Sequence, residues 1–277
     1  MPLMLALTAA AAITAPSPDA PMTPSGKWNV DYGASACTLG RVYGTGKTET
    51  TLVLRRVPLA STLDLMISTT DRNAAMRLGQ ATLSVGGPRA VGTSTQSRYE
   101  SYPTQSPGKR MMRTPVDVEM FDMLPADAVL RVAPDKGPGW AFILPSGKAA
   151  FEALATCNDS TAKLWGVDPA ERTRIAQPAK PRTSPEYWIT PADYPRTVAS
   201  SGAQGTSTIL WTIGIDGRST DCRTVVTSGE VELDKAACSA IIARARYTPA
   251  LGFDGKPVLS HITRKVAWRL TGAWSGG

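Results

Sequence analysis

The first half of the chain is a series of short apolar runs separated by turn-forming residues. The runs lie between Trp28 and about Leu144, with Gly, Pro, Asn and Asp between them. This punctuation is typical of antiparallel strands in a sandwich or a barrel. We therefore predict a mostly antiparallel β-sandwich-like domain over residues 27–166, built on KWNVDYG, ACTLGRVYG, TTLVLRRV, STLDLMIST, ATLSVGG, DVEMFDML, AVLRVA and GWAFIL.

The pattern changes to helical spacing at the end of this domain. In SGKAAFEALATCNDSTAKLWG, Phe151, Leu154 and Ala155 recur at the spacing of one helix face, and Ser146 stands where an N-cap is expected. We predict a helix that closes the domain and brings Cys157 toward the first strands.

A proline-rich segment follows over residues 167–190. It has no hydrophobic periodicity, and its prolines at 169, 178, 181 and 185 favour an extended chain. We predict a linker here.

The remaining residues, 191–272, predict a small αββαβ domain. A short helix from Pro191 to Gly202 precedes a hairpin that turns at Asp216-Gly217 and returns to Val226. One face of the first hairpin strand holds Ile209, Trp211, Ile213 and Ile215. A helix over VELDKAACSAIIARARY follows, with an apolar stripe at Leu233, Ala237, Ile241 and Arg244 and with Ile242 and Ala245 beside it.

The segment LSHITRKVAWRL predicts the last strand of this domain. Strand residues alternate between two faces. The inward positions would be Ile262, Val266, Trp268 and Leu270, and the outward ones Thr263, Lys265 and Arg269.

Composition places the chain among ordinary globular proteins. Of its 277 residues, 42% are hydrophobic and 19% charged, which excludes a disordered chain. Lys and Arg number 30 against 23 Asp and Glu, a formal net charge of +7. The excess is diffuse and does not interleave with aromatic residues, so we predict no nucleic-acid partner.

The apolar stretch from Pro2 to Ala15 indicates an export signal within residues 1–20. It is shorter than the roughly 20 residues that span a bilayer, so no stable membrane span is expected. The first basic residue is Lys27, which leaves a buried or flexible N-terminal arm as the alternative.

Four cysteines allow three pairings. In an exported protein they suit structural disulfides. We predict the pairs Cys37 with Cys157 and Cys222 with Cys238, because each then lies within one predicted domain.

The inventory of reactive groups argues against an enzyme, a cofactor or a metal site. The segment ending in Gly46-Lys47-Thr48 has Arg41 where a phosphate-binding loop needs glycine, so we predict a hairpin turn there. The sole histidine, His261, is interpreted as a solvent-facing strand residue, and the Ser146-Gly147 and Ser228-Gly229 pairs lack the G-x-S-x-G motif. The carboxylates Asp117, Glu119 and Asp122 are interpreted as a solvated face.

Residues 94–113, STQSRYESYPTQSPGKRMMR, read as a polar surface loop. Its basic residues are Arg98, Lys109 and Arg110. They leave open an alternative function, in which the chain is an exported binding or inhibitor protein whose N-terminal domain carries the activity.

The last third carries an ordered series of short motifs. They are Tyr194-Pro195, Asp216-Gly217-Arg218, VVTSG at 225–229, Leu233-Asp234 with Ala236-Ala237, Arg246-Tyr247-x-Pro249-Ala250, and Gly255-Lys256-Pro257-Val258. In order and spacing this segment resembles the C-terminal domain of TonB-type energy transducers. Cys222 and Cys238 resemble those of a subgroup of such domains in exported bacterial proteins. The N-terminal domain resembles, weakly, exported β-sandwich proteins of the invasion-associated locus B type.

The TonB resemblance implies a periplasmic interaction module of a Gram-negative bacterium, with a role in energy-dependent transport. In that family an extended segment of an outer-membrane transporter, or of another envelope protein, adds to the edge of the sheet. The partner-binding residues would be Tyr194, Pro195, Ile262, Thr263, Arg264, Lys265, Val266, Trp268 and Arg269.

The sheet edge has two other candidate occupants, and the chain differs from a full transducer. The edge could instead be covered by the tail TGAWSGG or by a second copy of the chain in a homodimer. A full transducer also carries a transmembrane helix and a long spacer, and their absence here argues against direct coupling to an inner-membrane proton channel.

Overall fold

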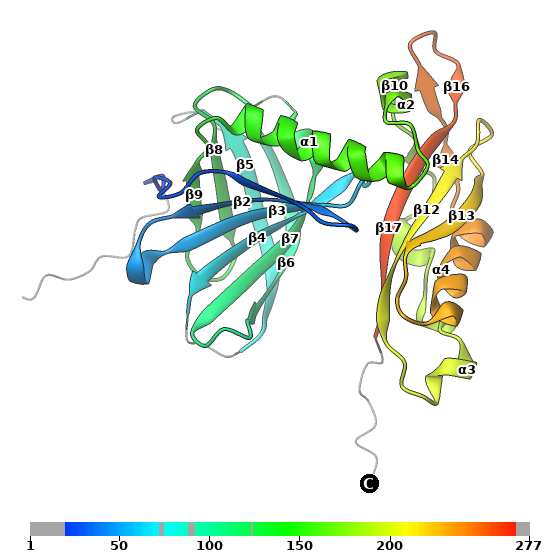
Figure 1. Ribbon diagram of the computed structural model, residues 1–277, viewed down its shortest axis with the longest axis horizontal. Helices are drawn as coiled ribbons and strands as arrows, with labels where there is room; N and C mark the ends of the chain where they lie inside the picture. Colours follow the sequence, from blue (N-terminus) through cyan, green and yellow to red (C-terminus); the bar gives the residue numbers. More distant parts are fainter. Residues whose placement is uncertain (1–19, 72–74, 88–91, 123, 270–277) are drawn as a thin grey trace, which may run out of the picture.

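A computed structural model describes residues 20–71, 75–87, 92–122 and 124–269. It contains a large curled sheet crossed by one long helix and, beside it, a smaller sheet backed by another helix (Figure 1). The predicted α+β class and the antiparallel N-terminal half are confirmed. The predicted export signal lies outside the described residues, apart from its last position.

The N-terminal half forms one nine-stranded sheet in which every neighbouring pair of strands is antiparallel, in the order β1-β2-β3-β4-β7-β6-β5-β8-β9. A short 3-10 turn, η1 (Gly46–Thr48), joins the second and third strands, as predicted for this hairpin. The strands are β1 (Asn29–Tyr32), β2 (Cys37–Tyr43), β3 (Thr50–Arg56), β4 (Thr62–Thr70), β5 (Arg77–Gly86), β6 (Thr93–Pro103), β7 (Lys109–Asp117), β8 (Val129–Pro134) and β9 (Trp140–Ile143).

Residues 22–26 connect the two ends of this sheet. The Met22 N–H donates to Ala141 O of β9 at 2.7 Å, and the Ser25 N–H donates to Val42 O of β2 at 3.0 Å. The Tyr43 hydroxyl spans the same seam to Ile143 O at 2.9 Å. The strands therefore close on themselves as a barrel, the second of the two architectures that the turn pattern allowed, rather than as two stacked sheets.

Two local predictions in this half are wrong. Residues 94–113 are not a surface loop but lie in the hairpin of β6 and β7, whose pairing runs from Glu100 with Arg113 to Pro103 with Arg110. The inward positions of these strands include Ser101, Arg110 and Thr114, so their alternation is not apolar and the pattern was missed. Within the run DVEMFDML, Asp117 ends β7 and the next four residues form a 3-10 turn, η2 (Val118–Phe121), instead of a strand.

Helix α1 (Gly147–Leu164) closes the barrel, as predicted. It buries Leu154 and Cys157, and Phe151 stacks on Phe121 with ring centroids 4.7 Å apart. Ser146 precedes the helix in a left-handed conformation and makes no capping hydrogen bond, so the predicted cap is wrong. The predicted Cys37–Cys157 disulfide is present and joins α1 to β2, with Cα atoms 6.0 Å apart.

The predicted linker contains short elements that pair with the C-terminal part. These are α2 (Ala170–Thr173), β10 (Ile175–Gln177), β11 (Lys180–Pro181) and η3 (Pro185–Tyr187). Strand β11 pairs with β14 (Tyr247–Thr248), and β10 pairs with β15 (Ala250–Gly252). Strand β15 also pairs with β16 (Pro257–Val258). The exact domain boundaries stay a prediction.

The C-terminal sheet has three antiparallel strands in the order β13-β12-β17, with one helix on one face. The predicted short helix is divided into η4 (Pro191–Asp193) and α3 (Arg196–Ala199). The hairpin, the helix and the last strand occur where predicted, as β12 (Gly205–Ile213), β13 (Ser219–Val226), α4 (Val231–Arg244) and β17 (Ser260–Trp268).

The core between this sheet and α4 follows the predicted alternation. Ile209, Trp211 and Ile213 lie in one buried cluster with Leu233, Ala237 and Ile241 of α4 and with Val266 and Trp268 of β17. Ile215, expected on the same face, is beyond the end of β12 and exposed. The predicted Cys222–Cys238 disulfide ties β13 to α4, with Cα atoms 5.4 Å apart. Leu270 lies outside the described residues.

Asp234 explains why several of the C-terminal motifs occur together. Its carboxylate accepts hydrogen bonds from the hydroxyls of Ser207 at 2.6 Å, Thr227 at 2.6 Å and Ser228 at 2.8 Å. The Ser228 N–H also donates to it at 3.0 Å. One side chain near the start of α4 thus fixes the strand β12 and the VVTSG turn.

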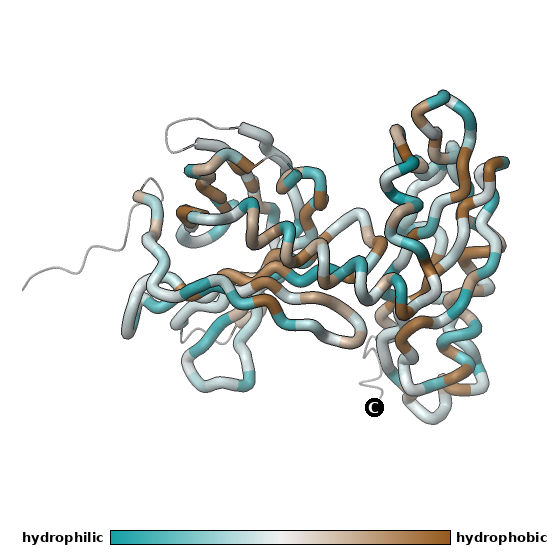
Figure 2. Tube along the Cα trace, turned by 45° about the horizontal axis from the view of Figure 1, so that its top comes forward, coloured by the Kyte–Doolittle hydropathy of each residue, from teal (hydrophilic) through white to brown (hydrophobic). Residues whose placement is uncertain are grey.

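The opposite face of the C-terminal sheet docks on the N-terminal half. Leu210 points away from α4, yet it is fully buried. Near it, Arg223 of β13 donates to Trp165 O at 2.6 Å, just past the end of α1, which reaches toward this sheet (Figure 1). The turn between β3 and β4 also meets this face, with Val57 and Pro58 both buried. Hydrophobic and hydrophilic residues alternate along the chain in both halves (Figure 2).

Candidate functional site

Strand β17 has a partner strand on one side only. It pairs with β12 along its whole length, from Ser260 with Ile213 to Trp268 with Gly205. Among the described residues no strand pairs with its other side. An edge of this kind leaves backbone N–H and C=O groups available to another chain.

A groove of about 440 Å³ runs along this free edge, between the two halves of the molecule. Consecutive residues 262–265 of β17 all line it. Because consecutive strand residues point to opposite faces, a cavity that touches all four must lie at the strand's flank. The other wall is formed by the N-terminal half, chiefly β3, β4 and β7, through Arg55, Thr62, Asp64, Arg113 and Pro115.

Direct contacts hold the N-terminal half against the strand. The Thr263 hydroxyl donates to Pro58 O at 2.5 Å, and the Lys265 ammonium lies 3.1 Å from the Asp64 carboxylate. Arg113 binds the other oxygen of Asp64 at 2.9 Å. Thr263 and Lys265 were expected to face outward; they do point away from the C-terminal core, but Thr263 is only 5% exposed because Pro58 covers it.

The groove carries an excess of positive charge. Its lining includes Arg55, Arg113, Arg264 and Lys265 against one carboxylate, Asp64. Burial, together with the neighbouring cations Arg55 and Arg113, lowers the pKa of Lys265 in spite of its pairing with Asp64. Burial also lowers the pKa of Arg264, whose guanidinium donates to Pro185 O at 2.7 Å. Both directions are those expected where nearby negative charge does not fully offset burial.

Aromatic side chains form the deep part of the groove. Trp188, Trp211 and Tyr247 line it from the C-terminal core, and the rings of Trp188 and Tyr247 meet edge to face at 5.2 Å. Neither the Trp211 indole nitrogen nor the Tyr247 hydroxyl makes a hydrogen bond of acceptable geometry among the described residues. Burial raises the pKa of Tyr247, and the neighbouring Trp211 offsets this only in part.

The structure brings together four of the predicted partner-binding residues and leaves the others elsewhere. Ile262, Thr263, Arg264 and Lys265 line the groove. Val266 and Trp268 are buried in the core against α4, and Tyr194 packs on Trp268 with ring centroids 5.7 Å apart. The remaining two are Pro195, which precedes α3, and Arg269, which donates to Gly205 O.

The N-terminal wall of the groove was missed by sequence reasoning. Arg55, Asp64 and Arg113 come from strands that are more than a hundred residues from β17. No local motif marks them, since each alternates with buried residues as an ordinary outward position of its strand.

His261 and the acidic side chains were the remaining candidates for chemistry in the sequence. His261 is not solvent-facing as expected, because it is largely buried and its Nδ1 lies 2.8 Å from the Glu171 carboxylate. Among the described residues, no group of three or more His, Cys, Asp or Glu side chains could hold a metal ion.

Comparison with known proteins bears on the C-terminal third. Residues 190–270 match the family model described as the Gram-negative bacterial TonB protein C-terminal. The predicted TonB resemblance is confirmed for this third of the chain. The solution NMR structure of the Pseudomonas aeruginosa TonB CTD is 25% identical and covers 34% of this chain and 87% of that chain, with a TM-score of 0.27. No curated protein matches the chain.

The TonB-like domain therefore lies at residues 190–270 and contains β12, β13, α4 and β17, together with the free edge. The barrel and the N-terminal wall of the groove precede the matched residues. In the part of the chain that the structure describes, no helix is both long and apolar enough to cross a membrane.

Proposed function

We propose that the protein is a periplasmic TonB-type interaction module that binds an extended segment of an outer-membrane transporter, or of another envelope protein, in the groove beside β17. The observation that carries this proposal is that residues 262–265 line the groove from both faces of β17, a strand that has a partner strand on one side only among the described residues. The TonB family match supports the class of partner. The two disulfides suit an oxidising compartment such as the periplasm.

Backbone hydrogen bonds would supply much of the affinity. A partner segment that adds to β17 satisfies unpaired N–H and C=O groups, which gives binding with little dependence on the partner's side chains. The nine residues of β17 span about 30 Å at roughly 3.3 Å per residue, enough for a segment of similar length.

The charge of the groove would supply selectivity. Arg55, Arg264 and Lys265 surround the place where a bound segment would lie, and the only carboxylate in the lining is already shared by Arg113 and Lys265. A partner segment with an acidic side chain would complete this compensation. We therefore expect the preferred partner segment to be extended and acidic.

Site-specific photocrosslinking in envelope extracts tests the proposal. Replacing the exposed β17 residue Ala267 with p-benzoylphenylalanine should yield crosslinks to an outer-membrane protein. The same replacement of Lys235, exposed on α4, is the control and should not. Crosslinks from Ala267 only to a second copy of the chain would support a homodimer instead, and equal crosslinking from both positions would contradict the proposal.

Charge reversal tests the selectivity. Arg55→Glu should reduce crosslinking from Ala267, because it removes a cation from the groove wall. Arg98→Glu, on the outer side of the barrel, is the matched control. If both variants crosslink as well as the unmodified chain, the partner segment is not selected by charge in this groove.

A further inference from the structure

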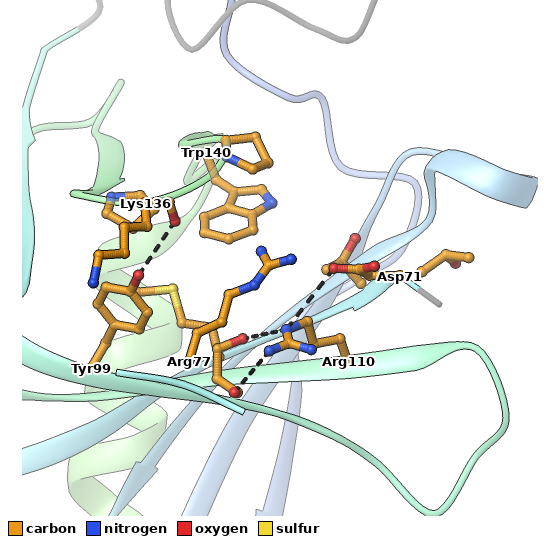
Figure 3. Close-up of a pocket in the computed structure, with 12 residues that line it drawn as sticks. Asp71, Arg77, Tyr99, Arg110, Lys136 and Trp140 are labelled. Atoms are coloured by element: carbon orange, nitrogen blue, oxygen red, sulfur yellow. Dashed lines mark hydrogen bonds and ion pairs between the residues drawn. The ribbon is translucent and has the colours of Figure 1, made fainter. Parts of the chain in front are cut away.

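A second cavity lies at one end of the barrel, apart from the TonB-like domain. It has a volume of about 200 Å³ and is lined by the ends of strands β4 to β9 and the turn after β8 (Figure 3). Cavities at barrel mouths are common places for small ligands.

The floor of the cavity holds a buried arginine. Arg110 is 3% exposed, although the barrel interior around it is otherwise mostly apolar. Its Nε donates to Ser101 Oγ at 2.7 Å, its Nη2 donates to the carbonyls of Ser101 and Ala75, and its Nε lies 3.9 Å from the Asp71 carboxylate. Burying a charge is costly unless it is paired and hydrogen-bonded. These contacts hold a fixed positive charge at the cavity floor.

A second arginine points into the cavity. Figure 3 shows the Arg77 guanidinium within the cavity, on the side of the Trp140 ring. No hydrogen bond or ion pair joins Arg77 to another residue that the structure describes. The lining also contains Lys136, whose carbonyl accepts a hydrogen bond from Tyr99. Three basic residues thus line the cavity against one acidic residue, Asp71.

The rest of the wall is apolar. Trp140, Met112, Pro134 and Pro138 face the cavity, and the indole ring of Trp140 stands beside the Arg77 guanidinium in Figure 3. A flat apolar wall beside cationic groups fits a molecule with a planar body and an anionic group.

We propose that this barrel-mouth cavity binds a small molecule that carries a carboxylate on a planar apolar body. Arg77 donates hydrogen bonds to the carboxylate of the ligand, and the fixed positive charge of Arg110 at the cavity floor attracts it. Trp140 packs on the planar apolar body of the ligand. This site is separate from the groove beside β17 and does not depend on the proposed function.

Isothermal titration calorimetry of the full-length protein tests the site, with benzoate as the probe and benzyl alcohol as its neutral counterpart. Benzoate should bind at least about tenfold more tightly than benzyl alcohol, the difference expected for a charge-assisted hydrogen bond. Equal affinities, or no benzoate binding with a Kd below about 10 mM, would overturn the proposal.

A matched pair of variants locates the binding. Arg77→Gln should weaken benzoate binding about tenfold or more. Arg98→Gln, an exposed position on the outer side of the same hairpin, should leave it unchanged. Trp140→Leu should weaken benzoate and benzyl alcohol alike, since it removes the packing surface for both. Equal benzoate affinity in the Arg77→Gln and Arg98→Gln variants would also overturn the proposal, whatever the crosslinking from β17 shows.

Discussion

Asp64 of β4 and Lys265 of β17 form an ion pair of 3.1 Å although 201 positions separate them in the chain. The pair joins the barrel to the TonB-like domain. It also links the two walls of the groove beside the free edge, because Asp64 lines one wall and Lys265 the other. Its strength therefore bears on how firmly the two halves are docked.

Replacing Asp64 by Asn should destabilise the docked arrangement. Lys265, which is mostly buried, would lose its carboxylate partner, and Arg113 would keep only its second partner, Glu100, at 3.1 Å, so we expect a loss of about 1–3 kcal/mol of unfolding free energy. Urea denaturation measures the loss. Glu232→Gln, in the exposed pair with Lys235, is the control and should cost less than about 0.5 kcal/mol. Equal losses in the two variants would show that the Asp64 contact does not contribute.

The same contact predicts an acid dependence. Burial raises the pKa of Asp64, but Lys265 and Arg113 outweigh it and hold the pKa below its ordinary value. A depressed carboxyl pKa contributes stability that is complete above the unfolded pKa of about 3.9 and is lost as pH falls through the folded value. The stability of Asp64→Asn should therefore fall less between neutral pH and about pH 3 than that of the unmodified chain. Parallel acid profiles would argue against the pair.

Asp234→Asn should destabilise the TonB-like domain. Burial opposes the charge of Asp234, but the hydrogen bonds from Ser207, Thr227 and Ser228 outweigh it and keep its pKa low. An amide cannot accept all of these bonds, so we expect a loss of about 2–3 kcal/mol at neutral pH, measured in urea. The loss should shrink as pH falls below about 4, since protonation then removes the same charge from the unmodified chain. Asp254→Asn, on an exposed turn, serves as the control.

Gly217→Ala should be more damaging than Gly229→Ala. Both glycines have positive φ angles, +77° and +95°, which strain any other residue. A Cβ at Gly217 would also lie 2.0 Å from the Tyr247 carbonyl oxygen, whereas nothing lies within 4 Å of one at Gly229. We expect about 1 kcal/mol for Gly229→Ala and clearly more for Gly217→Ala, by thermal unfolding. Equal costs would mean that only the backbone angle matters at Gly217.

The two disulfides should differ in their contribution to stability. Cys222–Cys238 closes a separation of 16 residues and Cys37–Cys157 one of 120. In the chain-entropy model these are worth about 3 and about 5 kcal/mol. Urea unfolding of the Cys222→Ser/Cys238→Ser and Cys37→Ser/Cys157→Ser variants measures both. A larger loss from the shorter loop would contradict the entropic explanation.

Local patterns in the sequence predicted much of the C-terminal third. Alternation at Ile209, Trp211 and Ile213, the Asp216-Gly217 turn and the helical stripe of Leu233, Ala237 and Ile241 each act over a few residues, and the structure confirms them. The two disulfide pairs were predicted from the domain division, because each pair lies within one predicted domain, and the structure has both.

The alternation of apolar and polar residues did not predict the strands whose inward face is polar. In β6 and β7 the inward residues include Ser101, Arg110 and Thr114, so the hairpin read as a surface loop. The polar inward residues at this end include Ser101 and Arg110 of the barrel-mouth cavity. A binding site that replaces apolar core residues thus removes the periodicity by which its strands are recognised.

By itself the sequence determined the elements whose burial pattern is local, the pairing of its cysteines and the likeness of its last third to the TonB C-terminal family. Only the tertiary structure decided that residues 22–26 close the sheet into a barrel and that Asp64 and Arg113 face Lys265 across a groove. The physical reason is that a strand's pattern shows which of its faces is buried, but not which distant surface covers that face. That choice depends on shape and charge complementarity between segments far apart in the chain.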